Sequence, residues 1–268
     1  MSSPAPQLPP ARPGPENEVK LTFIEHLRDL RVRLLRALYG VVAGMALVGW
    51  FVPSIVERLM APVRNALPAG KQTLVYTSAI EPMMVYIKVA IYGGVFVAAP
   101  WVLWQLWLFI APGLYKREKR VVWPFLVWAT VLFYGGAAFC YFVVLPQAFP
   151  AILAFAGGGT TLTPMLSLSQ QLSLVLAMML GFGVIFEVPI IIAFLSMVGL
   201  VDSRFLAKYR RHAIVVNVTL AAIITPTGDP FNLALLAVPM ILFYEIGIIL
   251  ARILGKKKEP AAARAGQV

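Results

Sequence analysis

Glu187 is the one charged residue in a thirty-residue apolar run, 172 to 201, and Pro189 lies two positions after it. A carboxylate at that depth in a membrane costs roughly 2.5 to 3.5 kcal/mol or more, so lipid cannot be its neighbour. Pro189 has no N–H and crowds the carbonyl of Ile185, which predicts a kink beside the acid. Together they predict that Glu187 faces a polar cavity. The alternative is a protonated carboxyl that is hydrogen-bonded to a neighbouring helix.

Two further acids, Asp29 and Glu118, each lie among basic residues next to an expected helix start. An acid in that position can bind a cationic segment of another protein. It can equally neutralise the neighbouring arginines, or stabilise the helix through the dipole by about 0.3 to 1 kcal/mol. The spacing alone leaves both interpretations open.

The residues for enzymatic chemistry are sparse. The sequence has no HExxH, GxSxG or Walker motif, and His26 and His212 both fall at the ends of apolar runs. The single cysteine, Cys140, lies in an apolar run, which excludes an internal disulfide and a thiolate metal cluster. We therefore expect a protein that is not an enzyme and uses no cofactor or metal.

The composition indicates an integral helical membrane protein. Hydrophobic residues make up 60% of the 268 positions and charged residues only 13%, so a water-soluble core is excluded. The net charge of +11 is not the footprint of a nucleic-acid-binding protein, because most Lys and Arg residues fall in four segments on one side of the apolar runs. These segments are 1–36, 111–121, 199–212 and the tail from 251. The positive-inside rule places them, and both termini, in the cytoplasm.

The apolar runs predict an all-α fold with six membrane spans. Outside segments are expected at Pro53–Val75, where a short surface helix fits, at Leu145–Leu168 and at Pro226–Pro230. We expect a disordered tail at 1–20, the transmembrane domain at 21–252 and a basic tail at 253–268. The predicted spans are about 34–52, 77–110, 121–144, 172–201, 213–224 and 231–251.

The fifth run, 213 to 224, is short for a membrane span. Its twelve residues cover roughly 18 Å as a helix, against about 30 Å of hydrocarbon. A locally thinned bilayer would accommodate it. No internal repeat is visible, so the inverted-repeat signature of many secondary transporters is missing.

Five motifs, in order and in spacing, resemble those of the TatC family, the receptor subunit of the twin-arginine protein translocase. Together they cover the membrane region from about 26 to 250, which makes the resemblance specific. The motifs are HLRDLRVRL at 26–34, FIAPGLYKREKR at 109–120, FGVIFEVPI at 182–190, TPTGDPF at 225–231 and LFYEIG at 242–247.

The resemblance implies a cupped six-helix bundle in the bacterial plasma membrane. It implies binding of the paired arginines in the signal peptide of a folded cargo protein. It further implies that the chain forms a homo-oligomer within a larger complex, which contains TatA- and TatB-type single-span subunits and membrane lipid. Transport would be driven by the proton-motive force. No nucleic acid is expected as a partner.

Carried over to this chain, the resemblance implies three sets of functional residues. Asp29 and Glu118 would contact the arginines, with Arg31 and Phe109 shaping the same patch. Glu187 would be the polar residue of the cup. The turn with Thr225, Pro226 and Asp229 would bind partner subunits.

The chain departs from the family pattern at two places. Asp29 stands where the family usually has Glu, and Asn232 and Leu233 follow the TPTGDPF motif where a Ser-Gln pair is usual. Two other classes of function remain. A proton-coupled transporter of small solutes would use Glu187 as the proton carrier, and a structural scaffold would tolerate neutral residues at positions 29 and 118.

Overall fold

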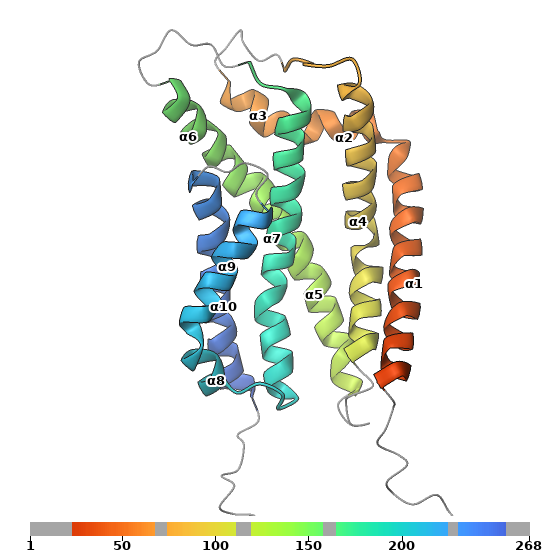
Figure 1. Cartoon of the computed structure of the whole chain (residues 1–268), viewed down its shortest axis with the longest axis vertical. Helices are drawn as coiled ribbons and strands as arrows, with labels where there is room; N and C mark the ends of the chain where they lie inside the picture. Colours follow the sequence, from red (N-terminus) through yellow and green to blue (C-terminus); the bar gives the residue numbers. More distant parts are fainter. Residues whose placement is uncertain (1–22, 68–73, 111–118, 158–164, 225–229, 256–268) are drawn as a thin grey trace, which may run out of the picture.

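The computed structural model describes residues 23–67, 74–110, 119–157, 165–224 and 230–255, and these residues form a helical bundle (Figure 1). The bundle has two ends. The α2 end, at the top of Figure 1, carries the short helices α2 (Val52–Leu59) and α3 (Ala61–Ala66). The α8 end, at the bottom, carries α8 (Ser203–Lys208) and the first residues of α1 (Phe23–Gly49).

Helix α1 packs along α4 (Glu81–Ile110), and the two run in opposite directions. Small residues allow this close approach, because a Cβ on Gly44 would collide with the backbone of Gly94. The indole Nε1 of Trp101 donates a hydrogen bond of 2.9 Å to the carbonyl of Arg36. The α1–α4 pair is therefore fixed in register. Helix α1 also begins before the predicted start near residue 34, since the amphipathic basic segment continues the same helix.

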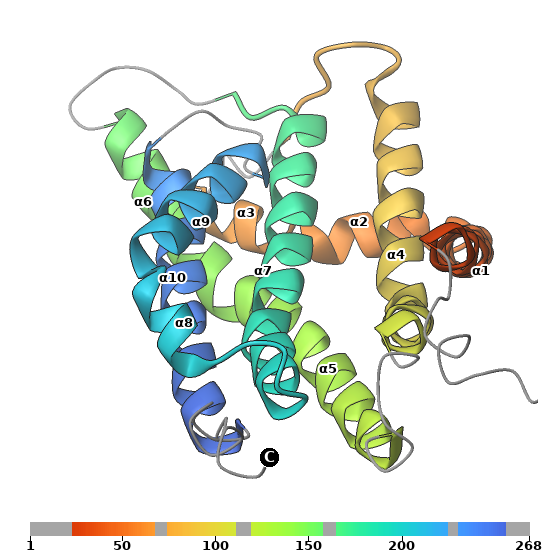
Figure 2. The same cartoon turned by 60° about the horizontal axis from the view of Figure 1, so that its bottom comes forward.

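Helices α2 and α3 lie across the α2 end of the bundle (Figure 2). They confirm the predicted surface helix within 53–75. Their buried residues, Val52 and Val63 among them, face the core, whereas Ser54, Glu57 and Arg58 are exposed. Helices with one apolar and one polar face are typical of a membrane interface.

The third span is longer than the sequence predicts. Helix α5 (Lys119–Phe139) continues through a five-residue π-helix, η3 (Cys140–Val144), into α6 (Leu145–Gly157). We expected residues 145–168 to form a loop because of Pro146 and Pro150, and for 145–157 that expectation is wrong. The wider turn of the π-helix changes the register of the chain just before Pro146, and Pro150 lies inside α6.

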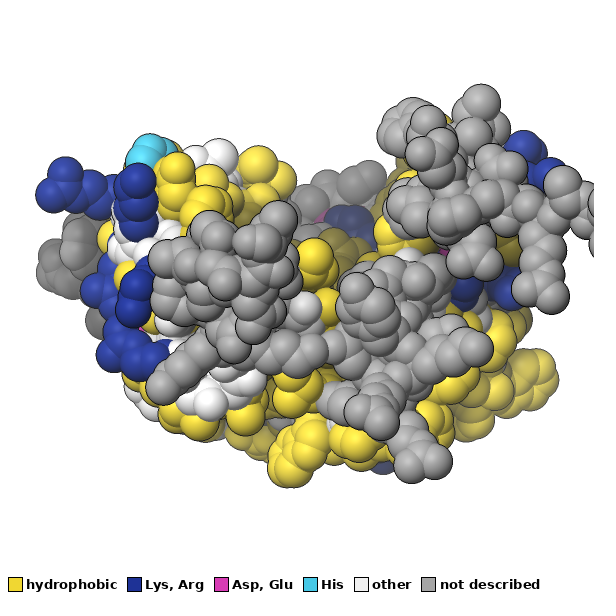
Figure 3. Space-filling model, turned by 90° about the horizontal axis from the view of Figure 1, so that it is seen from below, with side chains coloured by type: hydrophobic (Ala, Val, Ile, Leu, Met, Phe, Trp, Pro, Cys, Tyr) yellow, Lys and Arg dark blue, Asp and Glu magenta, His cyan; other side chains and the backbone are white. Residues whose placement is uncertain are grey.

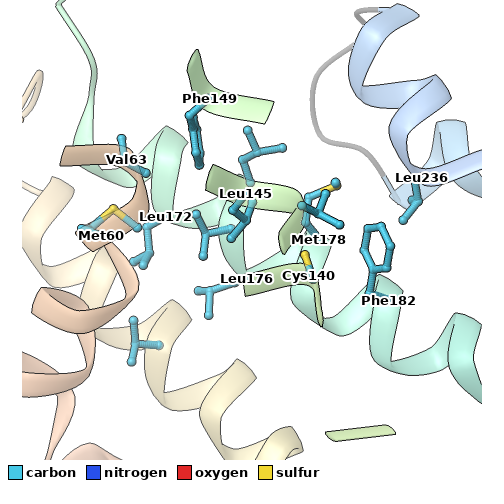
Figure 4. Close-up of a cluster of buried hydrophobic side chains, with 14 of the residues drawn as sticks. Met60, Val63, Cys140, Leu145, Phe149, Leu172, Leu176, Met178, Phe182 and Leu236 are labelled. Carbon is cyan, nitrogen blue, oxygen red and sulfur yellow. The ribbon is translucent and has the colours of Figure 1, made fainter. Parts of the chain in front are cut away.

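Helix α7 (Leu168–Met197) lies at the centre of the bundle and packs against α5 and α10 (Pro230–Leu254). The helix passes through Pro189 without interruption. Side chains from α3, η3, α6, α7 and α10 converge on the core that Figure 4 shows. They include Met60, Cys140, Leu145, Leu172, Phe182 and Leu236.

Five helical stretches of the described residues are long and apolar enough to cross a membrane. Helix α9 (Arg210–Ile224) is the sixth expected span, and its 15 residues reach about 22 Å, which is short as predicted. The five stretches are Leu27–Gly49, Glu81–Phe109, Trp123–Leu153, Leu168–Met197 and Leu233–Leu254.

Lys and Arg side chains gather at the α8 end, where Figure 3 shows them at both margins of the face. Helix α1 contributes Arg28, Arg31, Arg33 and Arg36, while α8, α9 and α10 contribute Arg204, Lys208, Arg210, Arg211 and Arg252. The spatial distribution therefore agrees with the asymmetry that the sequence predicts.

Candidate functional site

Asp29 lies in the second turn of α1 and forms an ion pair with Arg33, one turn farther along the same helix. The Nε of Arg33 donates to Oδ2 of Asp29 at 2.7 Å. The alternative in which this acid neutralises a neighbouring arginine is therefore realised in the free protein. The pair uses one carboxylate oxygen, and among the described residues no partner contacts Oδ1. The Asp29 side chain is 37% exposed, so a second guanidinium can reach it.

Phe109 and Arg31 lie at the same level of the bundle as Asp29. Trp101 is hydrogen-bonded to Arg36. From that contact, Asp29 is seven residues back along α1 and Phe109 is eight residues forward along α4, both toward the α8 end. These seven residues of α1 and eight residues of α4 each cover about 10 to 12 Å along the helix axis. The antiparallel register thus places three of the predicted patch residues at the same level, with Arg31 exposed and Phe109 half-buried. Their contact with one another stays a prediction.

Glu118 lies outside the described residues. Helix α4 ends at Ile110 and α5 begins at Lys119, so Glu118 immediately precedes α5 in the sequence. Its contact with the patch formed by Asp29, Arg31 and Phe109 stays a prediction. Thr225, Pro226 and Asp229 also lie outside the described residues, between the end of α9 and the start of α10.

Glu187 is buried in the middle of α7, with 5% of its surface exposed. Among the described residues, no hydrogen-bond partner contacts its Oε1. Its neighbours in sequence pack tightly: the ring of Phe186 contacts Phe139 and Phe243, and Gly183 lies against Phe133. The acid is therefore covered by protein and not by lipid, as predicted, while the polar cavity stays a prediction.

Replacing Glu187 with an apolar residue should not destabilise the protein. An unpaired buried carboxyl contributes its desolvation penalty, about 1 to 3 kcal/mol, and an apolar residue of similar size removes that penalty. We expect Glu187→Leu to unfold in detergent at the same temperature as the parent protein or higher. A fall in the unfolding temperature of several degrees would show that the carboxyl has a stabilising partner.

The sequence analysis missed two polar contacts between elements. Arg210 at the start of α9 pairs with Glu245 of α10 at 2.9 Å, and the hydroxyl of Tyr244 donates to the carbonyl of Leu206 in α8. These contacts hold the α8–α9 corner onto α10. Tyr244 and Glu245 could have indicated these contacts, because they are polar residues in an otherwise apolar run.

A second missed cluster lies at the α2 end. The carboxylate of Glu81 accepts hydrogen bonds from Thr77, from the hydroxyl of Ser167 at 2.6 Å and from the backbone N–H of Ser169 at 2.8 Å. Lys88, two turns into α4, donates to the hydroxyls of Ser169 and Ser173 at 2.9 and 2.8 Å. We call this cluster the α4–α7 seam, and it ties the starts of the two helices together.

Comparisons with known proteins agree with the resemblance in the motifs. The family model described as Sec-independent protein translocase protein (TatC) matches residues 25–239. A Sec-independent protein translocase protein TatC of Koribacter versatilis is 39% identical over 250 residues, which cover 91% of each chain. One of Desulforapulum autotrophicum is 38% identical over 242 residues, covering 90% of this chain and 88% of the relative.

A solved structure shares the fold. The crystal structure of a twin-arginine translocase receptor, TatC, superposes with a TM-score of 0.78 at 36% sequence identity. The match covers 85% of this chain and 99% of the other. The chain therefore shares its fold with that receptor over nearly all of the receptor's length.

Proposed function

The chain belongs to the TatC family of Sec-independent protein translocases, and from this premise we propose that it binds the twin-arginine signal peptide of folded cargo proteins. Translocase receptors of this family are not enzymes. The family also takes precedence over the two other functions that the sequence left open, a proton-coupled transporter of small solutes and a structural scaffold. We further propose that TatA- and TatB-type subunits assemble with this chain, at the turn with Thr225, Pro226 and Asp229 among other surfaces. Transport would use the proton-motive force.

The observation that carries the proposal is the common level of Asp29, Arg31 and Phe109 at the α8 end. A carboxylate with a free oxygen is the natural acceptor for the planar donor fork of an arginine. A half-buried phenylalanine beside it can pack against the apolar part of a signal peptide. Helix α4 ends one residue after Phe109, and Glu118 belongs to the short segment that follows. This proximity in sequence supports Glu118 as a second carboxylate of the same patch.

Photo-crosslinking tests the proposed site. A photoreactive amino acid at position 109 or 118 should crosslink to a signal peptide with paired arginines, and much less to a peptide with paired lysines. Position 142 is a matched control, because Phe142 is exposed but lies toward the α2 end. Equal crosslinking from positions 109 and 142 would place the signal peptide elsewhere.

We also propose an orientation in the bacterial plasma membrane, with the α8 end and both termini in the cytoplasm. The concentration of Lys and Arg at the α8 end supports it through the positive-inside rule. We propose the domain division at residues 20 and 252 as well, with the disordered tail 1–20 and the basic tail 253–268 both on the cytoplasmic side.

Single-cysteine labelling of intact cells checks the orientation. Cys140 is buried, so the parent protein gives little background. We expect an impermeant reagent to label Ser54→Cys in α2 from outside, and to leave Glu118→Cys and Leu206→Cys unlabelled until the membrane is opened. Labelling at 118 or 206 from the outside would show that the orientation is wrong.

A further inference from the structure

A cavity of about 440 Å³ lies at the α2 end, between the surface helices and the start of α4. Its volume is within the range of sites for small molecules, roughly 300 to 1,000 Å³. The polar side chains that line it are Glu57 of α2, Arg64 of α3, Tyr76 and Tyr86. Most of the other lining residues are apolar, Val56 and Val85 among them. The cavity therefore offers one charge of each sign against an apolar wall.

Neither charge is neutralised by another residue that the structure describes. Among the described residues, Glu57 and Arg64 form no ion pair with each other or with a third residue. Arg64 is half-buried, and Glu57 is exposed at the rim. A half-buried guanidinium has five N–H donors, and here they remain available for an anion. The charges are thus complementary to a ligand that has an anionic and a cationic group.

The wall of this cavity is held rigidly. The segment before α4 joins the start of α7 through hydrogen bonds of 3.0 and 3.1 Å between Val75 and the backbone at Leu166 and Leu168. The α4–α7 seam adds the four hydrogen bonds of Glu81, which is only 6% exposed. Tyr76 and Tyr86 therefore stand on a fixed frame, so the cavity is preformed.

The cavity lies at the level of lipid headgroups. Helix α4 has 30 residues, about 45 Å, which equals the thickness of a bilayer with both headgroup layers. Its first turns then lie in a headgroup layer, and Tyr86 is only five residues from the helix start. The amphipathic helix α2 lies across the same end, and tyrosines concentrate at membrane interfaces. Phospholipid is thus the most abundant ligand at this place.

We propose that this cavity binds the headgroup of a zwitterionic phospholipid, with the phosphate on Arg64 and the ammonium on Glu57. The tyrosine hydroxyls supply further hydrogen bonds to the phosphate. The acyl chains leave along the exposed apolar side chains of Met83 and Ile87 on α4. The site needs a protein that spans the membrane, but it depends neither on the proposed orientation nor on signal-peptide binding.

The test is lipid retention by detergent-solubilised protein in native mass spectrometry. The probes are phosphatidylethanolamine, which has both charges, and phosphatidylglycerol, which lacks the ammonium. We expect the parent protein to prefer phosphatidylethanolamine by about fivefold or more. Arg64→Gln should lose binding of both lipids, while Glu57→Gln should lose only the preference. Arg58→Gln is the matched control, because Arg58 is an exposed cation of α2 that does not line the cavity.

Equal retention of both lipids by the parent protein and both cavity variants would overturn the proposal. Displacement of the lipid by an equal concentration of soluble phosphoethanolamine would also contradict it, because a free zwitterion would then be the ligand. Unfolding temperatures of the variants provide the folding control. If Arg64→Gln unfolds early, Arg64→Lys keeps the positive charge and should retain phosphatidylethanolamine.

Discussion

Glu118→Arg is expected to weaken binding of a twin-arginine signal peptide by about a hundredfold or more. A charge-assisted hydrogen bond contributes about 1.5 to 3 kcal/mol, so losing one carboxylate costs roughly ten- to a hundredfold in affinity. The new arginine adds repulsion to a segment that already carries Lys116, Arg117, Lys119 and Arg120. The measurement is peptide binding to the detergent-solubilised variant at a fixed salt concentration.

Glu118→Gln is the matched control, since it removes the charge without adding a repulsive one. Its affinity should fall between those of the parent protein and Glu118→Arg. The unfolding temperature should barely change in either variant, because Glu118 belongs to a charged segment of the sequence and not to an apolar run. Parent-like binding by Glu118→Arg would mean that the receptor site is elsewhere.

Gly136→Leu should have the largest effect on folding. A Cβ at Gly136 of α5 would collide with the carbonyl oxygen of Phe182 and the ring of Phe186 on α7. Overpacking of this kind costs about 1 to 3 kcal/mol or more, and a backbone carbonyl cannot move aside by changing rotamer. We expect the unfolding temperature in detergent to fall by several degrees, or the folded protein to be lost, because α5 and α7 must separate.

The neighbouring Gly135 is an ideal control for that change. A Cβ at Gly135 has no atom within 4 Å. Gly135→Leu should therefore unfold near the temperature of the parent protein. Helix propensity favours Leu over Gly equally at both positions, so it cannot lower the stability of either variant. If both variants lost the same stability, the contact with α7 would not be the cause, and the proposed packing would be wrong.

The spans were predictable because the thickness of the hydrocarbon layer sets the length of an apolar run, and the positive-inside rule sets the side of the Lys and Arg residues. The extension of the third span through 145–157 was not, since Pro146 and Pro150 are strong loop signals. The packing of α6 on α3 and in the central core overrides them. The burial of Glu187 followed from its cost in lipid, but its contacts depend on the neighbouring helices.

The candidate site was predicted only in part, for a similar reason. The sequence could not decide whether Asp29 pairs with its own helix, because the spacing of four residues to Arg33 permits the pair without requiring it. The cavity between Glu57 and Arg64 left no sequence signal, since two short helices and Tyr86 of α4 meet there only in the fold.

The most direct test of the proposed function compares two peptides on two proteins. The dissociation constants of signal peptides with paired arginines and with paired lysines are measured for the parent protein and for the double variant Asp29→Asn/Glu118→Gln. An ammonium cannot reproduce the bidentate geometry of a guanidinium on a carboxylate, so the parent protein should prefer arginine by about tenfold or more. We predict that this preference disappears in the double variant. A double variant that still prefers arginine to the same extent would contradict the account.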